Sequence, residues 1–289
     1  MTYRLKTGVE PRMDTDKHGW IRIWKLQGLL PTAVLFLLPL LPVFGAEKKA
    51  ASDPLAAPYL EPELLSVQHS LYPEALWQGQ TKEKVVALSF DDGPSRYTPA
   101  LLDVLKRKHV SATFFVLANR AARFPETVRR EQQEGHRIGL HGRTHASLHG
   151  MPDAEIVSNL QQAENSVREI LGPQNSPSLW YFRAPFLDVS HRIIRTAESC
   201  HTRVVMCTIM PGEQLLWPNG WRELPGKTTK RVLRDIGPGG IICLHDGQDL
   251  GLHDGVEDCP YAARNASEII DALRERGYKF VTIDKLDKR

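Results

Sequence analysis

Two adjacent carboxylates, Asp91 and Asp92, end an apolar run and stand directly before a Gly-Pro turn. Consecutive side chains diverge, so we expect one carboxylate to hold a cation and the other to move a proton. Pairs of solvated acids are common, so the pair alone is weak evidence for a functional site. Support for such a site comes from other polar residues that also follow apolar runs. Three such groups lie further along the chain: a His-x-x-x-His at 141–145, an Arg-Ala-Pro-Phe at 183–186 and a Leu-His-Asp at 244–246.

His141 and His145 have the spacing of two ligands for one metal ion. On a helical turn, residues four apart lie on one side, and a carboxylate from another strand would complete a site with open positions, the pattern of a catalytic metal. We expect one divalent ion, Zn²⁺ first, with Co²⁺, Mn²⁺, Ni²⁺ or Fe²⁺ as alternatives. Such an ion polarises a carbonyl group and lowers the pKa of a bound water. The His-x-x-x-His pattern alone is equally typical of a solvated loop. A further histidine, His149, is expected at the surface.

The other two groups supply a histidine and an arginine. His245, beside Asp246, suits a general acid whose ring is oriented by a carboxylate; the alternative is a buried core histidine. Arg183 suits a partner of the base carboxylate, whose pKa it would lower, although a purely structural salt bridge is also compatible.

The elements that must position these residues are strands and helices in alternation. Strands are expected over 85–90, 111–118, 136–141, 179–185, 203–209, 239–246 and 279–283, with helices between them. Such alternation predicts parallel strands with right-handed crossovers, and continuous apolar runs indicate strands buried on both faces. In an open sheet the candidate residues would be spread out, whereas in a barrel the strand ends converge. We therefore predict an α/β fold, a (β/α) barrel with seven strands.

The N-terminal region differs from the rest in charge and hydropathy. Residues 1–46 carry the whole formal net charge of +3, and residues 29–46 form an apolar run behind a basic flank. This indicates a signal peptide or a membrane anchor, with three prolines favouring the signal. Residues 47–81 are expected as a linker and 82–289 as the catalytic domain. The protein is therefore expected to be exported (periplasmic, cell-envelope or secreted), with membrane contact only through residues 28–46 if they are retained.

Charge and cysteine spacing exclude two further classes of site. Beyond residue 46 the charges balance and form no basic stripe, so no nucleic-acid partner is expected. The four cysteines, Cys200, Cys207, Cys243 and Cys259, include no Cys-x-x-Cys pair, so a zinc–thiolate site is not expected. Cys207 and Cys243 lie in strand-like runs and are interpreted as buried thiols; export permits a disulfide, but the spacing selects no pair.

The segments SFDDGP, HGRTH, RAPF and LHD, in this order and spacing, resemble the motifs of the polysaccharide deacetylase family, the NodB-homology or carbohydrate esterase family 4 domain. The resemblance covers about residues 82–287 and implies a distorted (β/α)7 barrel. It also implies roles for individual residues: Asp91 as catalytic base, Asp92, His141 and His145 as metal ligands, Arg183 as the residue that positions the base, His245 as general acid, Phe186 as an oxyanion donor through its backbone N–H, and Leu244 as part of the apolar wall for the acetyl methyl group.

Two departures from the family pattern stand out. Gly142 occupies a position where Ser or Thr is usual, which removes a supporting hydrogen bond. The aspartates of the fourth motif are absent from 208–217, where Glu213 is either a substitute that orients Arg183 or a loop residue without a role. Trp217 is expected to supply the aromatic wall of the pocket. This change predicts altered specificity or rate.

The implied activity is metal-dependent hydrolysis of N-acetyl groups on the sugars of a polysaccharide: peptidoglycan, a chitin-like polymer or poly-N-acetylglucosamine. An O-acetyl xylan esterase, or another amide hydrolase with the same site, is the nearest alternative. A non-catalytic glycan-binding protein is the alternative from another class. In each case the partner is an acetylated glycan.

Overall fold

The computed structural model describes residues 62–288, except 213, 218–219, 224–225 and 248–258. The expected signal or anchor at 1–46 and the first part of the expected linker therefore lie outside the described residues. Among the helices that are described, none has both the length and the apolar character needed to cross a membrane.

Strands and helices alternate through the described residues. The strands of the main sheet are β1 (Val85–Asp91), β2 (Thr113–Val116), β3 (Arg137–Leu140), β4 (Trp180–Phe182), β5 (Thr202–Val204), β8 (Ile241–His245) and β9 (Lys279–Phe280). The helices that connect or flank them are α3 (Thr98–Arg107), α4 (Ala118–Arg123), α5 (Pro125–Gln133), α6 (Asp153–Leu171), α7 (His191–Ser199), α8 (Lys227–Asp235), α9 (Ala262–Glu275) and α10 (Ile283–Leu286). All seven predicted strands are present, most of them shorter than the apolar runs that predicted them.

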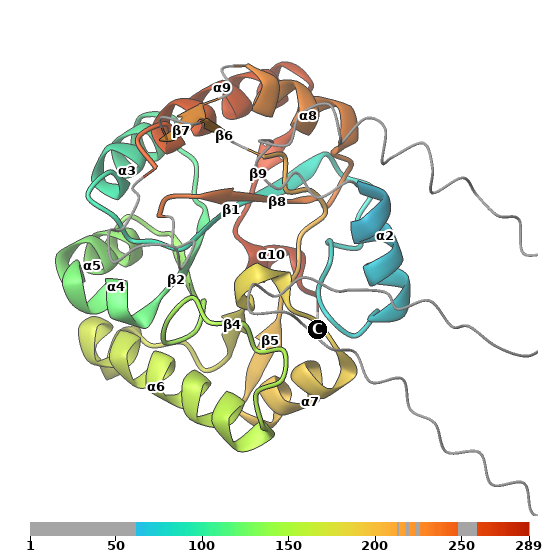
Figure 1. Ribbon diagram of the computed structural model, residues 1–289. Coiled ribbons are helices and arrows are strands. Elements are labelled where there is room, and N and C mark those ends of the chain that lie inside the picture. The colour runs from blue at the N-terminus through green and yellow to red at the C-terminus, as the bar shows by residue number, and fades with distance from the viewer. Residues whose placement is uncertain (1–61, 213, 218–219, 224–225, 248–258, 289) are drawn as a thin grey trace, which may run out of the picture. The chain divides into compact units, whose positions relative to one another are not determined.

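The seven strands form one parallel sheet in the order β5-β4-β3-β2-β1-β8, with β9 paired to the first residues of β1. Helices surround the sheet (Figure 1). Between β5 and β8 the regular ladder is interrupted, and isolated bridges such as Ile209 with Ile242 link the chain segments there. The predicted α/β fold of seven parallel strands is confirmed, in the form of a distorted (β/α) barrel.

Burial on both faces explains why the strands are continuously apolar. In β1, Val86, Ala87 and Leu88 are fully buried, because one face meets the interior and the other meets the surrounding helices. The long helix α6 instead buries one stripe, in which Ile156, Leu160, Ala163 and Val167 recur at helical spacing. The inner layer of strands and the outer layer of helices therefore follow from the continuous and the helical apolar patterns. Because the strands are parallel, their carboxyl ends lie at one edge of the sheet.

The predicted linker is wrong in its second half. Residues 62–71 form helix α2 (Pro62–Leu71), and Leu65, Leu76 and Trp77 are buried in the core. The backbone N–H of Leu76 donates to the carbonyl of Val204 at 2.9 Å, next to the interruption between β5 and β8. The core of the described residues therefore includes residues from helix α2 onward. Among the described side chains of this helix, Leu64, Val67 and Leu71 are exposed and only Leu65 is buried, so the apolar residues do not mark a buried face that could be recognised in the sequence.

Further elements were not predicted, among them a hairpin and a short helix. The antiparallel hairpin of β6 (Gln214–Trp217) and β7 (Gly220–Glu223) begins within 208–217, the segment where the fourth motif is expected. Helix α4 begins within the apolar run 111–118, which was interpreted wholly as a strand. Short apolar runs do not distinguish the end of a strand from the start of a helix.

His136, just before β3, gives the fold a predicted sensitivity to acid. The backbone N–H of Ala112 donates to its Nδ1 at 3.1 Å, and burial lowers the pKa of His136 from 6.5 to about 4. As pH falls below 6.5 the unfolded chain binds a proton here and the folded chain does not, so stability is lost down to about pH 4. The loss through this group is on the order of 3 kcal/mol.

His136→Asn keeps an acceptor for Ala112 and cannot be protonated. We expect its free energy of unfolding, measured by urea denaturation, to fall less steeply than that of the wild type between pH 6.5 and 4. Parallel curves for the two proteins would contradict this assignment. Comparison at pH 7.5, where His136 is neutral in both states, controls for any loss of packing.

Candidate active site

The predicted site residues lie at the carboxyl ends of four different strands. Asp91 ends β1 and His245 ends β8, and the two are paired in register. His141 directly follows β3, where its N–H donates to the carbonyl of Val116 at 2.9 Å. Arg183 directly follows β4. Because parallel strands end at one edge of a barrel, these four side chains are brought to one face of the domain.

Asp92, His141 and His145 converge on one point. The Nε2 atoms of His141 and His145 lie 3.1 and 3.3 Å from Asp92 Oδ1. All three side chains are nearly inaccessible to solvent, and the two imidazole centroids are 5.4 Å apart. The structure therefore assembles a two-histidine, one-carboxylate cluster from residues 53 positions apart in sequence.

The hydrogen bonding of His141 indicates what this cluster holds. Its Nδ1 lies 2.7 Å from the carbonyl oxygen of Arg183, so Nδ1 carries the proton and Nε2 presents a lone pair. That lone pair faces Asp92 Oδ1, a buried oxygen without a hydrogen-bond partner among the described residues. Two facing acceptors repel each other unless a cation lies between them.

The spacing of the donor atoms fits a metal ion. Two atoms bound tetrahedrally to one ion at about 2.0–2.1 Å lie roughly 3.3 Å apart. The separations of Asp92 Oδ1 from the two Nε2 atoms, 3.1 and 3.3 Å, agree with this value. Asp92, His141 and His145 therefore form a candidate site for one divalent metal ion.

Asp92 is held in an unusual backbone conformation. Its φ is 69°, a left-handed value that costs a non-glycine residue about 1–3 kcal/mol and is most often found at functional sites. Burial acts to raise the pKa of its carboxyl group, but positive charge on His145 and His141 outweighs burial and lowers the pKa below its ordinary value. With neutral imidazoles, a cation held by the same three side chains would favour the ionised carboxylate in the same way. Asp92 is therefore ionised, as a metal ligand must be.

The segment that carries His145 is a loop, so the predicted helical turn is wrong. Gly142 has φ of 94°, and a Cβ there would lie 3.0 Å from Asn159 Oδ1. That oxygen accepts a hydrogen bond from the N–H of Arg143 at 3.0 Å. Glycine is therefore required here, and Asn159 of α6 supports the loop that a Ser or Thr would otherwise brace.

Asp188 fixes the other end of the histidine loop. Its Oδ2 accepts hydrogen bonds from Ser147 Oγ at 2.6 Å, from the N–H of Leu148 at 2.7 Å and from the N–H of His149 at 3.2 Å. The His149 side chain is exposed, as predicted. The loop is thus held at both ends.

Arg183 is fully buried and binds the carboxylate of Asp91. One terminal nitrogen donates to Asp91 Oδ1 at 2.7 Å and to Ser89 Oγ at 2.8 Å, and the other donates to the carbonyl of Met206 at 2.8 Å. Burial disfavours the charge, but Asp91 outweighs it and the pKa of Arg183 is raised. The group expected to orient Arg183 was not identified from sequence; the described contacts assign this to Ser89 and the Met206 carbonyl.

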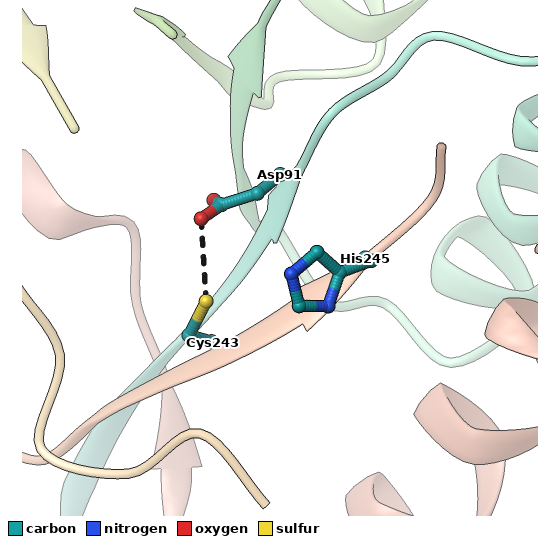
Figure 2. A group of neighbouring side chains, drawn as sticks. All are labelled: Asp91, Cys243 and His245. Carbon is teal, nitrogen blue, oxygen red and sulfur yellow. Dashed lines mark hydrogen bonds between the residues drawn. The ribbon is translucent and has the colours of Figure 1, made fainter. Parts of the chain in front are cut away.

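A second cluster contains Asp91, Cys243 and His245 (Figure 2). The thiol of Cys243 donates to Asp91 Oδ2 at 3.2 Å. This cluster is poorly suited to a metal, because the Arg183 guanidinium already supplies a cation 2.7 Å from the same carboxylate. The two clusters therefore differ in kind, because, among the described residues, only in the second does a guanidinium group of the chain neutralise the carboxylate.

Leu244 lies on the opposite face of β8 from His245. Side chains alternate along a strand, so Cys243 and His245 share one face of β8 and Leu244 points to the other. Leu244 is paired in register with Phe90, and both are fully buried. It is therefore Cys243, and not Leu244, that shares the face of β8 with His245. No sequence signal distinguished the two faces, because both neighbours are apolar.

Asp246 likewise points away from the face of His245. Its Oδ2 accepts a hydrogen bond from Thr98 Oγ1 at 2.6 Å, at the start of α3. Burial raises the pKa of Asp246 to about 7. The described contacts therefore connect Asp246 to α3, which differs from its predicted role in orienting the imidazole.

Phe186 lies beside the histidine cluster in a strained turn. Its φ is 60°, that of Leu187 is 55°, and its ring centroid is 4.3 Å from that of His145. The ring is 57% exposed, so it presents an apolar surface at the mouth of the site. Trp217 ends β6, and its side chain, like Glu213, lies outside what the structure describes.

Known proteins share both the sequence pattern and the fold. A model of the polysaccharide deacetylase family matches residues 78–205. A chitooligosaccharide deacetylase of Bradyrhizobium sp. is 32% identical over 207 residues, which cover 70% of this chain and 90% of that protein. A chitin deacetylase of Colletotrichum lindemuthianum is 40% identical over 209 residues, which cover 70% of this chain and 79% of that protein.

Solved structures agree with these sequence matches. A family 4 acetyl xylan esterase from Clostridium thermocellum, solved in complex with a cobalt ion, superposes with a TM-score of 0.59 at 26% identity. The match covers 70% of this chain and 90% of that chain.

Proposed function

This chain belongs to the polysaccharide deacetylase family, and on that premise we propose that it is a metal-dependent hydrolase that removes N-acetyl groups from N-acetylated sugars of a polysaccharide. The observation that carries the proposal is the pairing of a metal-binding cluster, Asp92, His141 and His145, with an adjacent carboxylate, Asp91, that Arg183 holds in place. A hydrolase needs both parts: a Lewis acid and a base.

We assign the proton transfers to Asp91 and His245. Arg183 donates to Asp91 Oδ1, so Oδ2 is the oxygen left to accept a proton from the attacking water. His245 lies in register with Asp91 at the end of β8 and gives a proton to the nitrogen as the carbon–nitrogen bond breaks. The products are acetate and the free amine of the sugar.

The metal ligands in this proposal are Asp92, His141 and His145. When bound, a divalent ion would polarise the acetyl carbonyl and make the water more acidic. The two imidazole nitrogens and one carboxylate oxygen suit Zn²⁺, our first choice, and also Co²⁺, Mn²⁺, Ni²⁺ or Fe²⁺. The acetyl xylan esterase was solved with a cobalt ion, and Co²⁺ is one of these candidate ions.

Phe186 is assigned to the carbonyl oxygen and the mouth of the pocket. Its strained backbone, beside His145, supports a role for the N–H of Phe186 in stabilising the oxyanion. Its exposed ring is suited to packing against a sugar face. Trp217 remains a candidate for the aromatic wall by resemblance alone.

The substrate is proposed from the relatives, which are named for chitin and chitooligosaccharides. Such glycans lie outside the cytoplasm, in agreement with the apolar segment 29–46 and with the proposed export. A second candidate, O-acetyl ester hydrolysis on xylan, is favoured by the similarity to the acetyl xylan esterase.

Acetate release from a panel of glycans tests the proposal. The panel contains chitooligosaccharides, peptidoglycan, poly-N-acetylglucosamine and acetylated xylan, and the metal content of the same sample is measured. We expect release from an N-acetylated glycan in the presence of about one equivalent of metal. Release only from acetylated xylan would favour the esterase, and glycan binding without any release would identify a non-catalytic protein.

A further inference from the structure

We propose that Cys243 is a positioning residue for Asp91, which its thiol holds at Oδ2 while Arg183 holds Oδ1 (Figure 2). The role rests on the proposed function, in which Asp91 is the base. The proposal goes beyond that function because it assigns a positioning role to the thiol of Cys243. The aspartates of the fourth motif are absent from the sequence at 208–217.

Strand pairing brings the two groups together. In the parallel ladder of β1 and β8, Ser89 is paired with Cys243 and Asp91 with His245. Alternation then places Cys243 on the face of β8 that carries His245. Its Sγ lies 3.2 Å from Asp91 Oδ2, and both residues are nearly inaccessible to solvent. The register of β1 and β8 therefore determines the contact between Cys243 and Asp91.

The sulfur donates this hydrogen bond. The pKa of Cys243 is raised well above its ordinary value by its contact with the Cys207 thiol, by burial and by the negative charge of Asp91. Its one S–H proton is donated to Asp91 Oδ2, because an anionic carboxylate is a stronger acceptor than a thiol. Cys243 therefore stays a neutral thiol, and a carboxylate can only accept from it. With Oδ1 bound to Arg183 and Oδ2 to Cys243, rotation of the carboxylate group breaks two hydrogen bonds.

A thiol is suited to the oxygen that must receive a proton. The guanidinium bond to Oδ1 is charge-assisted and strong, whereas S–H is a weak donor. Cys243 therefore orients Oδ2 while leaving it basic. The pair of donors therefore separates the anchored oxygen, Oδ1, from the reactive oxygen, Oδ2.

The test compares three substitutions that separate hydrogen bonding from packing. Cys243→Ser keeps a donor, Cys243→Ala removes it, and Cys243→Val removes it but fills the space. Steady-state acetate release is measured on the glycan that the wild type hydrolyses best. We expect kcat to fall about tenfold in the Ala and Val variants, with KM and metal content unchanged, and Ser to recover most of the loss. Equal rates for Ser and Ala, or recovery by Val, would overturn the proposal.

A spectroscopic measurement tests the contact without relying on turnover. The infrared S–H stretching band of Cys243 is identified by its loss in Cys243→Ser. In Asp91→Asn we expect this band to move to higher frequency, because the thiol loses its anionic acceptor. An unshifted band would overturn the hydrogen bond whether or not any glycan is hydrolysed. Failure of the deacetylase proposal, by contrast, appears as a wild type that releases no acetate from any glycan.

Discussion

His141→Ala is expected to lose bound divalent metal and acetate release together. His141 Nε2 lies 3.1 Å from Asp92 Oδ1, and the carbonyl of Arg183 fixes its ring with the lone pair toward that oxygen. Alanine leaves two of the three ligands, and we expect metal affinity to fall by at least ~100-fold, beyond the usual effect of removing a partner that only supports a ligand. Metal content of the purified variant and acetate release are measured on the same sample.

His149→Ala is the matched control, since it removes a histidine from the same loop. The His149 side chain is 66% exposed and lies outside the metal cluster. We expect this variant to keep both its metal and its activity. A His141→Ala protein that retains the metal content of the wild type would refute the assignment of this cluster.

The second large effect is expected at Asp91. Asp91→Asn preserves the shape of the side chain but cannot accept the proton of the attacking water. We expect acetate release to fall by about 10²- to 10⁴-fold, the usual contribution of a general base. The metal should remain bound, because Asp91 is not among the three converging ligands. Rates are measured at saturating glycan, together with metal content.

The neighbouring substitution distinguishes the two aspartates. Asp92→Asn removes an ionised ligand, so we expect it to lower metal content, whereas Asp91→Asn should not. Asp91→Asn also leaves the fully buried Arg183 without its anion, which costs about 3–5 kcal/mol. Its melting temperature is therefore checked before rates are compared. An Asp91→Asn variant within tenfold of the wild-type rate would exclude Asp91 as the base.

The positions of the candidate residues along the chain were predictable from sequence. Each follows an apolar run, and alternation of strands and helices requires those runs to end at one edge. The seven strands and the convergence of Asp92 with His141 and His145 follow from this local pattern, because burial on both faces is visible in residue type alone. The helical turn predicted for 141–145 was wrong, but the support of Asn159 and Asp188 still brings both imidazoles to Asp92.

Which neighbour of each residue faces the site was decided by tertiary structure. Cys243 and Leu244 are adjacent and both buried, and only the pairing of β8 with β1 determines that the thiol contacts Asp91. In the same way, Arg183 is oriented by Ser89 and by the carbonyl of Met206, a backbone group that carries no sequence signature.

The parallel α/β architecture and the residues available for metal binding and proton transfer could be predicted from the sequence. Residue type and spacing report burial and local chemistry directly. Tertiary structure alone decided how Asp91 is held between Arg183 and Cys243, and that the core includes residues from helix α2 onward. Those features depend on strand register and on contacts between residues far apart in the chain, which no local pattern encodes.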